Sequence, residues 1–228
     1  MSLCPFAVVR LLPESATQPT IAPRVAILHS AAGRGSLYGF FRNSSNLESH
    51  FWVSDAGVIE QYVDTNRRAD ANLHANGFAV SIETESSPQA TERWTEPQAA
   101  AIVRLLDWLC TEHPNIRRRQ CDSPTGSGIG WHIMFGTPGP WTPVAKSCPG
   151  PARVAQARDE IIPAVAAGTT TTPEEFTMDQ EARDAFAALD AKLDRIIASE
   201  RTNTARTLEN TRGLRKILVR LGLAKPKG

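Results

Sequence analysis

The stretch "GFAVSIETE", residues 77–85, is a short apolar run that ends in charged side chains. Short apolar runs that contain β-branched residues are typical of buried strands. A second such run, "RVAILHS" at 24–30, ends at His29. After the run at 77–85, residues 97–112 have apolar side chains at helical spacing, which predicts an amphipathic helix. A buried strand that leads into an amphipathic helix indicates an α/β domain.

Further segments extend this pattern of strands and helices. The runs "LESHFWVS" (47–54) and "VIEQYVD" (58–64) flank "DAG", which predicts a β-hairpin with Gly57 at positive φ. Residues 125–143, "TGSGIGWHIMFGTPGPWTP", read as a Gly- and Pro-rich loop around one apolar patch. Residues 150–167 predict a helix that begins at a proline, which a first helical turn permits. The predicted fold is α/β, with a central mixed β-sheet flanked by helices.

The composition limits the classes of protein to which the chain can belong. Its 228 residues are 41% hydrophobic and 21% charged, which is typical of a globular protein with one domain and an appendage. A net charge of +1 argues against a nucleic-acid-binding protein. The N-terminal apolar run lacks a basic start and is interrupted by Arg10 and Pro13, so it is a poor signal peptide. We therefore expect synthesis in the cytoplasm without a signal peptide.

The chain changes character after residue 167. Residues 168–177, rich in threonine, read as a linker. Residues 178–228 are helix-forming with an imperfect apolar stripe, which predicts a coiled coil that forms a homo-oligomer, a helical hairpin, or a short helix packed on the main domain. The end of this tail is basic, which suits contact with the anionic cell envelope, although a solvated helix is equally compatible. The main domain is accordingly predicted at 1–167.

Two histidines and one cysteine carry metal-binding chemistry. His29 ends a strand, His132 stands between glycines in "GWHIMFG", and Cys148 follows in "KSCPGPAR". Imidazole and thiolate are preferred ligands of Zn²⁺, and three protein ligands with a fourth position for water form the catalytic arrangement. Scattered histidines and cysteines more often simply pack. Lys146 could stabilise an oxyanion and Glu83 could act as general base, unless both are solvent-facing surface charges.

Five segments, in this order, resemble the zinc-dependent N-acetylmuramoyl-L-alanine amidases of the type 2 family: "ILHSA", "ESHFWVSDAGVIEQYVD", "LHANGFAVSIETE", "GWHIMFG" and "KSCPGPAR". That family includes phage lysozyme-type amidases and the peptidoglycan recognition proteins. The resemblance covers residues 24–166. The sequences of the segments "HFWVS" and "WTPVAKSCPGP" are most similar to those of endolysins from phages that infect actinobacteria. The resemblance implies the peptidoglycan recognition protein-like amidase fold, with the C-terminal helical segment added to it.

Carried onto this sequence, the resemblance implies a Zn²⁺ ion held by His29, His132 and Cys148. It also implies that Glu83 is the general base and that Lys146 stabilises the transition state. The resemblance therefore implies that residues 1–167 are a zinc amidase catalytic domain.

The resemblance further concerns residues around the substrate. It implies that His74 lines the muramyl-peptide groove. Trp141, in a longer loop than usual, is expected to form a wall of the substrate cleft or, equally, to pack inside the domain. Many members have a catalytic tyrosine where this chain has Ser49, so the chain resembles the members that use a glutamate base. His50 points into the core in the family and is expected to be structural.

The implied activity is cleavage of the amide bond between N-acetylmuramic acid and the L-alanine of the stem peptide. The expected partner is peptidoglycan, the site of action is the bacterial cell wall, and a holin is the family's usual export helper. A phage endolysin for host lysis is the expected role. The alternatives are a virion-associated wall hydrolase and a non-catalytic peptidoglycan-binding module, and non-catalytic relatives typically lack the cysteine present here as Cys148.

Overall fold

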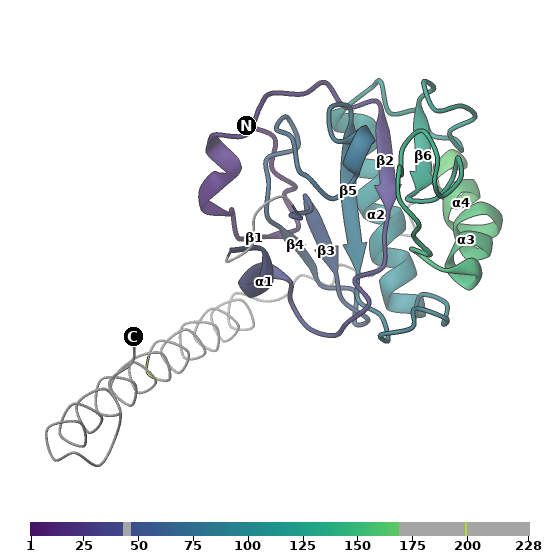
Figure 1. Ribbon diagram of the computed structural model, residues 1–228, viewed down its shortest axis with the longest axis horizontal. Helices are drawn as coiled ribbons and strands as arrows, with labels where there is room; N and C mark the ends of the chain where they lie inside the picture. Colours follow the sequence, from purple (N-terminus) through teal and green to yellow (C-terminus); the bar gives the residue numbers. More distant parts are fainter. Residues whose placement is uncertain (43–46, 169–198, 200–228) are drawn as a thin grey trace, which may run out of the picture. The chain divides into compact units, whose positions relative to one another are not determined.

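The computed structural model describes residues 1–42, 47–168 and 199, and the strands of this part of the chain form one six-stranded sheet (Figure 1). In chain order the strands are β1 (Val8–Val9), β2 (Val25–Leu28), β3 (Phe51–Val53), β4 (Ile59–Gln61), β5 (Ala79–Thr84) and β6 (Gly128–Trp131). They lie side by side in the order β1-β4-β3-β5-β2-β6. The pair β3–β4 is antiparallel and the other neighbours are parallel. The predicted mixed sheet is confirmed.

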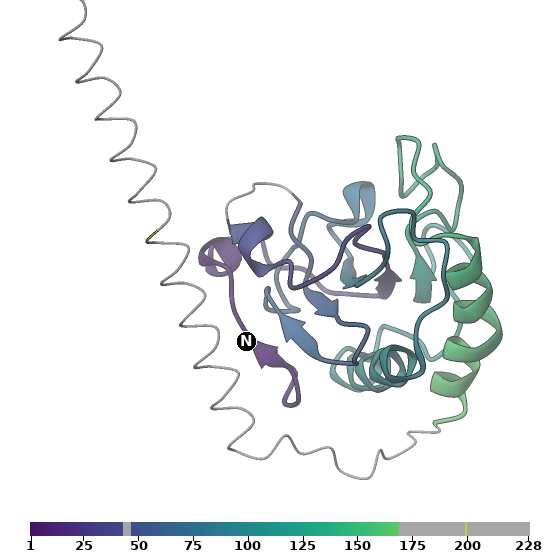
Figure 2. The same cartoon turned by 90° about the horizontal axis from the view of Figure 1, so that it is seen from below.

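One face of the sheet is covered by α2 (Glu96–Glu112), which Figure 2 shows in end view beside the strands. Thr95 caps the helix, because its side chain accepts a hydrogen bond from the backbone of Gln98, and Pro97 occupies the first turn. The apolar stripe of α2 joins one core cluster with alternate strand residues, namely Ala26, Leu28, Val80, Ile82, Ile129 and Trp131. Because strand side chains alternate between faces, the residues between these point away from α2. The helix predicted over 97–112 is therefore confirmed as the main cover of the core.

Shorter helices complete the described chain. They are η1 (Pro13–Ala16), α1 (Tyr38–Arg42), η2 (Leu73–Ala75), α3 (Pro151–Gln156), η3 (Ala157–Ile161) and α4 (Ile162–Ala166). The last three follow one another without a break beyond the β6 edge of the sheet (Figure 1), and η3 is a π-helical turn. The helix predicted over 150–167 is confirmed in extent, with a π-helical turn in its middle.

The hairpin prediction is also confirmed. Phe51, at the start of β3, pairs with Gln61, at the end of β4. Gly57 has φ of 83°, and a Cβ atom there would lie 2.7 Å from the carbonyl oxygen of Pro97. The turn therefore requires glycine both for its backbone conformation and for its close approach to α2.

The interpretation of residues 125–143 as a loop region was wrong in part, because it contains β6. This strand pairs along its whole length with β2. Its glycines conceal the strand pattern, but the packing requires one of them: a Cβ atom at Gly130 would lie 2.8 Å from the sulfur of Met134 and 3.1 Å from the ring of Trp141. The strand is thus specified by its neighbours more than by its own propensity. The two-residue β1 and the short α1 were not predicted either.

The predicted linker at 168–177 and helical tail at 178–228 lie outside the described residues, apart from Gly168 and Ser199. Among the residues that are described, none belongs to a helix with the length and hydrophobicity that a membrane crossing requires.

Candidate active site

The parallel strands β2, β5 and β6 are in register at the point where β2 and β6 end, and this brings three polar side chains together. Leu28 lies opposite both Ile82 and Trp131. The next position along these three segments is occupied by His29, Glu83 and His132. The backbone of His29 donates to the carbonyl of Ile82 at 2.9 Å and that of His132 to the carbonyl of Leu28 at 3.2 Å, so the register continues. Since Leu28, Ile82 and Trp131 face α2, the three polar residues face the other way.

Cys148 reaches the same place from the loop that precedes α3. The backbone N–H of Ser30, the residue after His29, donates to the sulfur of Cys148 at 3.1 Å. The chain then turns at Gly150, which has φ of 96° and where a Cβ atom would lie 2.2 Å from the carbonyl oxygen of Ala90. Only glycine fits there, so Gly150 fixes the path from the cysteine into α3.

The ligand atoms of His29, His132 and Cys148 all lie within 4.8 Å of one another. The two imidazole rings are 4.3 Å apart between centroids. This separation is short enough for one ion to contact all three groups after small side-chain shifts. In the described part of the chain no other group of three such residues gathers in this way.

Burial sets the protonation of the three groups. It lowers the pKa of His29 well below its usual value and that of His132 to about 4. Burial also raises the pKa of the Cys148 thiol to about 12. Both imidazoles are therefore neutral near pH 7, as metal ligands must be, whereas the thiol needs a nearby cation to lose its proton.

Glu83 lies beside His29, and one of its carboxyl oxygens has no hydrogen-bond partner in the protein. Its side chain is 15% exposed, and Oε1 lies 3.7 Å from Nδ1 of His29. Its Oε2 is buried without a hydrogen-bond partner. Burial raises the pKa of Glu83 to about 8, although the charges of Lys146 and Arg153 act in the opposite direction. A buried carboxyl group with a pKa near neutrality and a free oxygen is suited to general base chemistry.

The site fits a divalent cation with nitrogen and sulfur ligands. Nε2 of His132 is, like Oε2 of Glu83, buried without a hydrogen-bond partner. Buried polar atoms without partners are costly, and a bound ion and its water would satisfy them. Two imidazoles and one thiolate, with a carboxyl group close by, match the ligand preference of Zn²⁺ in sites that keep one position open.

Lys146 lies at the rim of the group. Its backbone N–H donates to Oγ1 of Thr137 at 2.6 Å, which fixes the loop, and its side chain is exposed. Its positive charge lowers the pKa of both Glu83 and His132, although burial has the larger effect on each.

The other predicted residues lie outside this group. His74 is exposed on η2. Trp141 is only 2% exposed, packs edge-on against Phe135, and donates from Nε1 to the carbonyl of Pro124 at 2.9 Å. Of the two roles expected for Trp141, the structure therefore shows packing, because its ring has no surface to offer a substrate. Ser49 is buried and donates to the carbonyl of Phe51.

Sequence reasoning missed Asn72. Its Oδ1 lies 2.8 Å from Nε2 of His29, although the two residues are 43 positions apart. Nothing around Asn72 in the sequence indicates this contact, because it depends on how the loop before β5 folds over β2.

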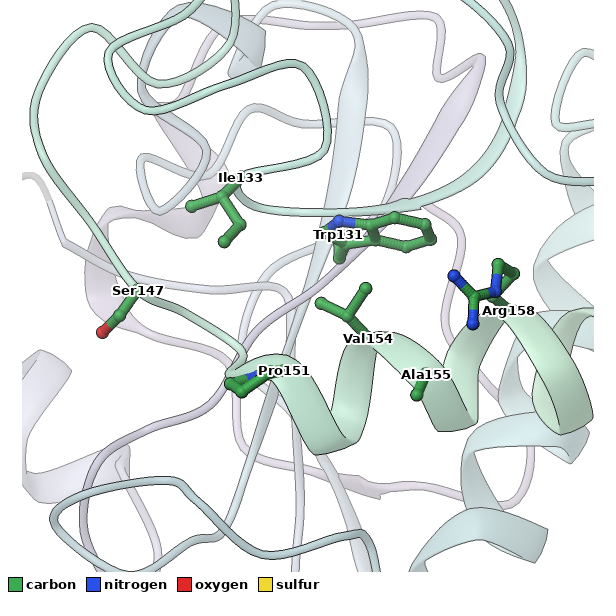
Figure 3. A pocket seen from close by; sticks show the side chains of 7 residues that line it. All are labelled: Trp131, Ile133, Ser147, Pro151, Val154, Ala155 and Arg158. Carbon is green, nitrogen blue, oxygen red and sulfur yellow. The ribbon is translucent and has the colours of Figure 1, made fainter.

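A groove of about 420 Å³ borders the site between β6 and α3 (Figure 3). It is lined by Trp131, Ile133, Ser147, Pro151, Val154, Ala155 and Arg158. Ile133 and Ser147 adjoin His132 and Cys148 in sequence, but His132 and Cys148 do not line the groove. The guanidinium group of Arg158 is engaged by Asp159 at 2.7 Å. The groove thus offers mainly apolar surface and no reacting group.

Comparison with known proteins places the chain in a family. Residues 19–151, more than half of the chain, match the family described as N-acetylmuramoyl-L-alanine amidase. None of the curated proteins matches the sequence. Among solved structures, the PlyG catalytic domain is similar with a TM-score of 0.53 and 16% identity, over 73% of this chain and 97% of that one. PlyL is similar with a TM-score of 0.52 and 18% identity, over 71% of this chain and 98% of that one. At these identities the two structures support the fold, and the family match supports the activity: the chain belongs to the N-acetylmuramoyl-L-alanine amidase family.

Proposed function

We propose that the protein is a zinc-dependent peptidoglycan hydrolase that cleaves the amide bond between N-acetylmuramic acid and the L-alanine of the stem peptide. The observation that carries this proposal is the convergence of His29, His132 and Cys148 beside an unpartnered oxygen of Glu83. The family match supplies the substrate class. Zinc would be held by the two imidazoles and the thiolate.

The residues around the ligands have separate tasks in this reaction. Bound Zn²⁺ would polarise the scissile carbonyl and lower the pKa of water. Glu83 takes a proton from the attacking water at Oε2, the oxygen that has no partner in the protein, and returns it to the leaving amine. The ammonium group of Lys146 stabilises negative charge that develops on the carbonyl oxygen. His74, exposed on η2, is proposed to contact the muramyl peptide.

The biological role that we propose is that of a phage endolysin, made in the host cytoplasm and released to the cell wall with the help of a holin. The similarity of the segments around Phe51 and Cys148 to actinobacteriophage endolysins supports this role. A role as a virion-associated hydrolase would use the same chemistry. Detection of the protein in purified particles, and not only in lysates, would favour the virion role.

Substitution of the site residues tests the proposed chemistry. We expect Cys148→Ala to lose both zinc and the release of stem peptides from peptidoglycan. Glu83→Gln should retain zinc but lose about 10²–10⁴-fold in turnover, because it cannot accept a proton. The measurements are zinc content by elemental analysis and the rate of stem-peptide release.

Glu85→Gln is the matched control for the glutamate. Glu85 follows Glu83 by two residues, but its oxygens accept hydrogen bonds from the backbone of Gly35 and Asp55. We expect near-normal turnover in this variant. Undiminished turnover in Glu83→Gln would remove the base assignment, and a folded Cys148→Ala protein that still releases stem peptides would overturn the zinc mechanism.

A further inference from the structure

Asn72 is a fully buried amide at the start of η2 that has no part in the chemistry described above. Its side-chain oxygen, Oδ1, lies within hydrogen-bond distance of Nε2 of His29. The opposite ring atom of His29, Nδ1, faces Glu83. Asn72 therefore lies behind the ligand, on the side away from the carboxyl group.

The orientation of the Asn72 amide is fixed by its other contacts. Its Nδ2 donates to the backbone carbonyl of Ala79 at 3.3 Å. Its backbone N–H donates to Oδ1 of Asn76 at 2.8 Å, which holds the turn. Because the NH₂ group must face the carbonyl of Ala79, the oxygen of the amide faces His29.

This orientation determines which nitrogen of His29 carries hydrogen. An amide oxygen only accepts hydrogen bonds, so Nε2 of His29 must donate at the 2.8 Å contact. An imidazole that binds a metal ion is neutral and has a single N–H, so an N–H on Nε2 leaves the lone pair on Nδ1. That lone pair points to the side where Glu83 lies.

We propose that Asn72 is a positioning residue that fixes the tautomer and the ring orientation of His29 for metal binding. This inference rests on the proposed zinc chemistry. Metal-binding histidines generally donate their second N–H to an acceptor, and loss of that acceptor typically costs about 10–100-fold in metal affinity. Asn72 provides this acceptor to His29 from a loop far away in sequence.

Two substitutions at position 72 separate positioning from packing. Asn72→Leu and Asn72→Asp both remove Nδ2 and therefore both lose the hydrogen bond to Ala79. Only Asn72→Asp keeps an oxygen that can accept from His29. We expect the zinc affinity of Asn72→Leu to fall about 10–100-fold, and that of Asn72→Asp to stay much closer to the unsubstituted protein.

The experiment measures zinc affinity by chelator competition on the full chain, together with thermal unfolding of the zinc-free proteins. Asn76→Ala is the matched control, because it disturbs the same turn and leaves the contact with His29 in place. It should lower thermal stability with little change in zinc affinity. If Asn72→Leu does not fold, Asn72→Ala takes its place, because it removes the acceptor without overfilling the site.

Two results would overturn the inference: normal zinc affinity in the folded variant that lacks the acceptor, or equal losses in Asn72→Leu and Asn72→Asp. The second result would mean that the bond to Ala79 and the packing of the loop matter, and not the contact with His29. Both results require that the unsubstituted protein binds zinc, because its affinity is the reference for the variants. An unsubstituted protein that neither binds zinc nor releases stem peptides would instead refute the proposed function.

Discussion

Two buried histidines, His50 and His132, differ in how their ring nitrogens are satisfied. Nδ1 of His50 accepts from the backbone of Ser81 at 3.0 Å, and Nε2 lies 2.8 Å from the carbonyl oxygen of Arg67. Nε2 of His132 is buried with no partner. A histidine with both nitrogens engaged inside the protein is structural, whereas one with an unused nitrogen is available as a ligand. This contrast supports the structural role expected for His50.

The burial of His50 makes stability depend on pH. It lowers the pKa of His50 to about 4, from an ordinary value of about 6.5. Between these values the unfolded chain binds a proton that the folded protein does not, so the free energy of unfolding decreases as pH falls through this window. We expect His50→Gln to be less stable at pH 7 but to lose less stability on acidification. The difference in slope should be about 1.4 kcal/mol per pH unit.

Urea unfolding at a series of pH values between 7 and 4 measures this difference. The other buried histidines are common to both proteins, so the difference between the two curves isolates His50. Parallel curves would show that His50 takes up its proton in the folded state as readily as in the unfolded chain.

At the scale of elements, Arg153 joins α3 to the end of β5. Its guanidinium group is fully buried and donates to Oγ1 of Thr84 at 3.0 Å, to the carbonyl of Glu85 at 2.9 Å and to the backbone and carboxylate of Glu92, both at 3.2 Å. The hydroxyl of Thr84 in turn donates to the carbonyl of His29. One arginine therefore ties the helix that follows Cys148 to the strands that carry Glu83 and His29.

Loss of Arg153 should lower the free energy of unfolding by more than the loss of an exposed ion pair would. Arg153→Met removes the hydrogen bonds of a fully buried guanidinium group to Thr84, Glu85 and Glu92, and we expect a loss of about 3 kcal/mol in the free energy of unfolding. Arg93→Met is the control. Arg93 pairs with Glu160 at 2.6 Å, but both side chains are about half exposed, so that loss should be under about 1 kcal/mol. Denaturant unfolding measures both values, and equal losses would contradict the importance given to burial.

The elements show which parts of the fold a sequence can predict. The strands β2 and β5 and the helix α2 were predictable, because apolar runs and helical spacing leave a local pattern. The strand β6 was not, because Gly128 and Gly130 weaken that pattern and pairing with β2 determines the conformation. The π-helical turn between α3 and α4 likewise has no local sign.

The residues of the candidate site also differ in whether the sequence alone could indicate them. The resemblance to a family indicated His29, His132, Cys148 and Glu83, and the structure brings these residues together. Asn72 and Arg153 were not indicated, because their roles arise from contacts between segments far apart in the sequence. The packing of Trp141 could not be decided either, since a tryptophan in a loop can equally serve as a surface or as an anchor.

At the scale of the whole molecule, the described residues up to 168 contain the sheet, its covering helix and the three residues proposed to hold zinc. We therefore propose that residues 1–167 are the catalytic domain, with residues 168–177 as a linker. For the tail at 178–228 we propose either oligomer formation through its apolar stripe or contact with the envelope through its basic end.

Removal of residues 170–228 tests this division. We expect the shortened protein to release stem peptides from soluble peptidoglycan fragments at the rate of the full chain, because no ligand or base is lost. It should differ either in mass by analytical sedimentation, if the tail forms oligomers, or in co-sedimentation with cell envelopes, if the tail binds them. Salt discriminates further, since contact through the basic end should weaken as ionic strength rises, whereas apolar association should not. An unchanged mass together with unchanged envelope binding would refute both roles for the tail, and loss of turnover on soluble fragments would refute the domain boundary.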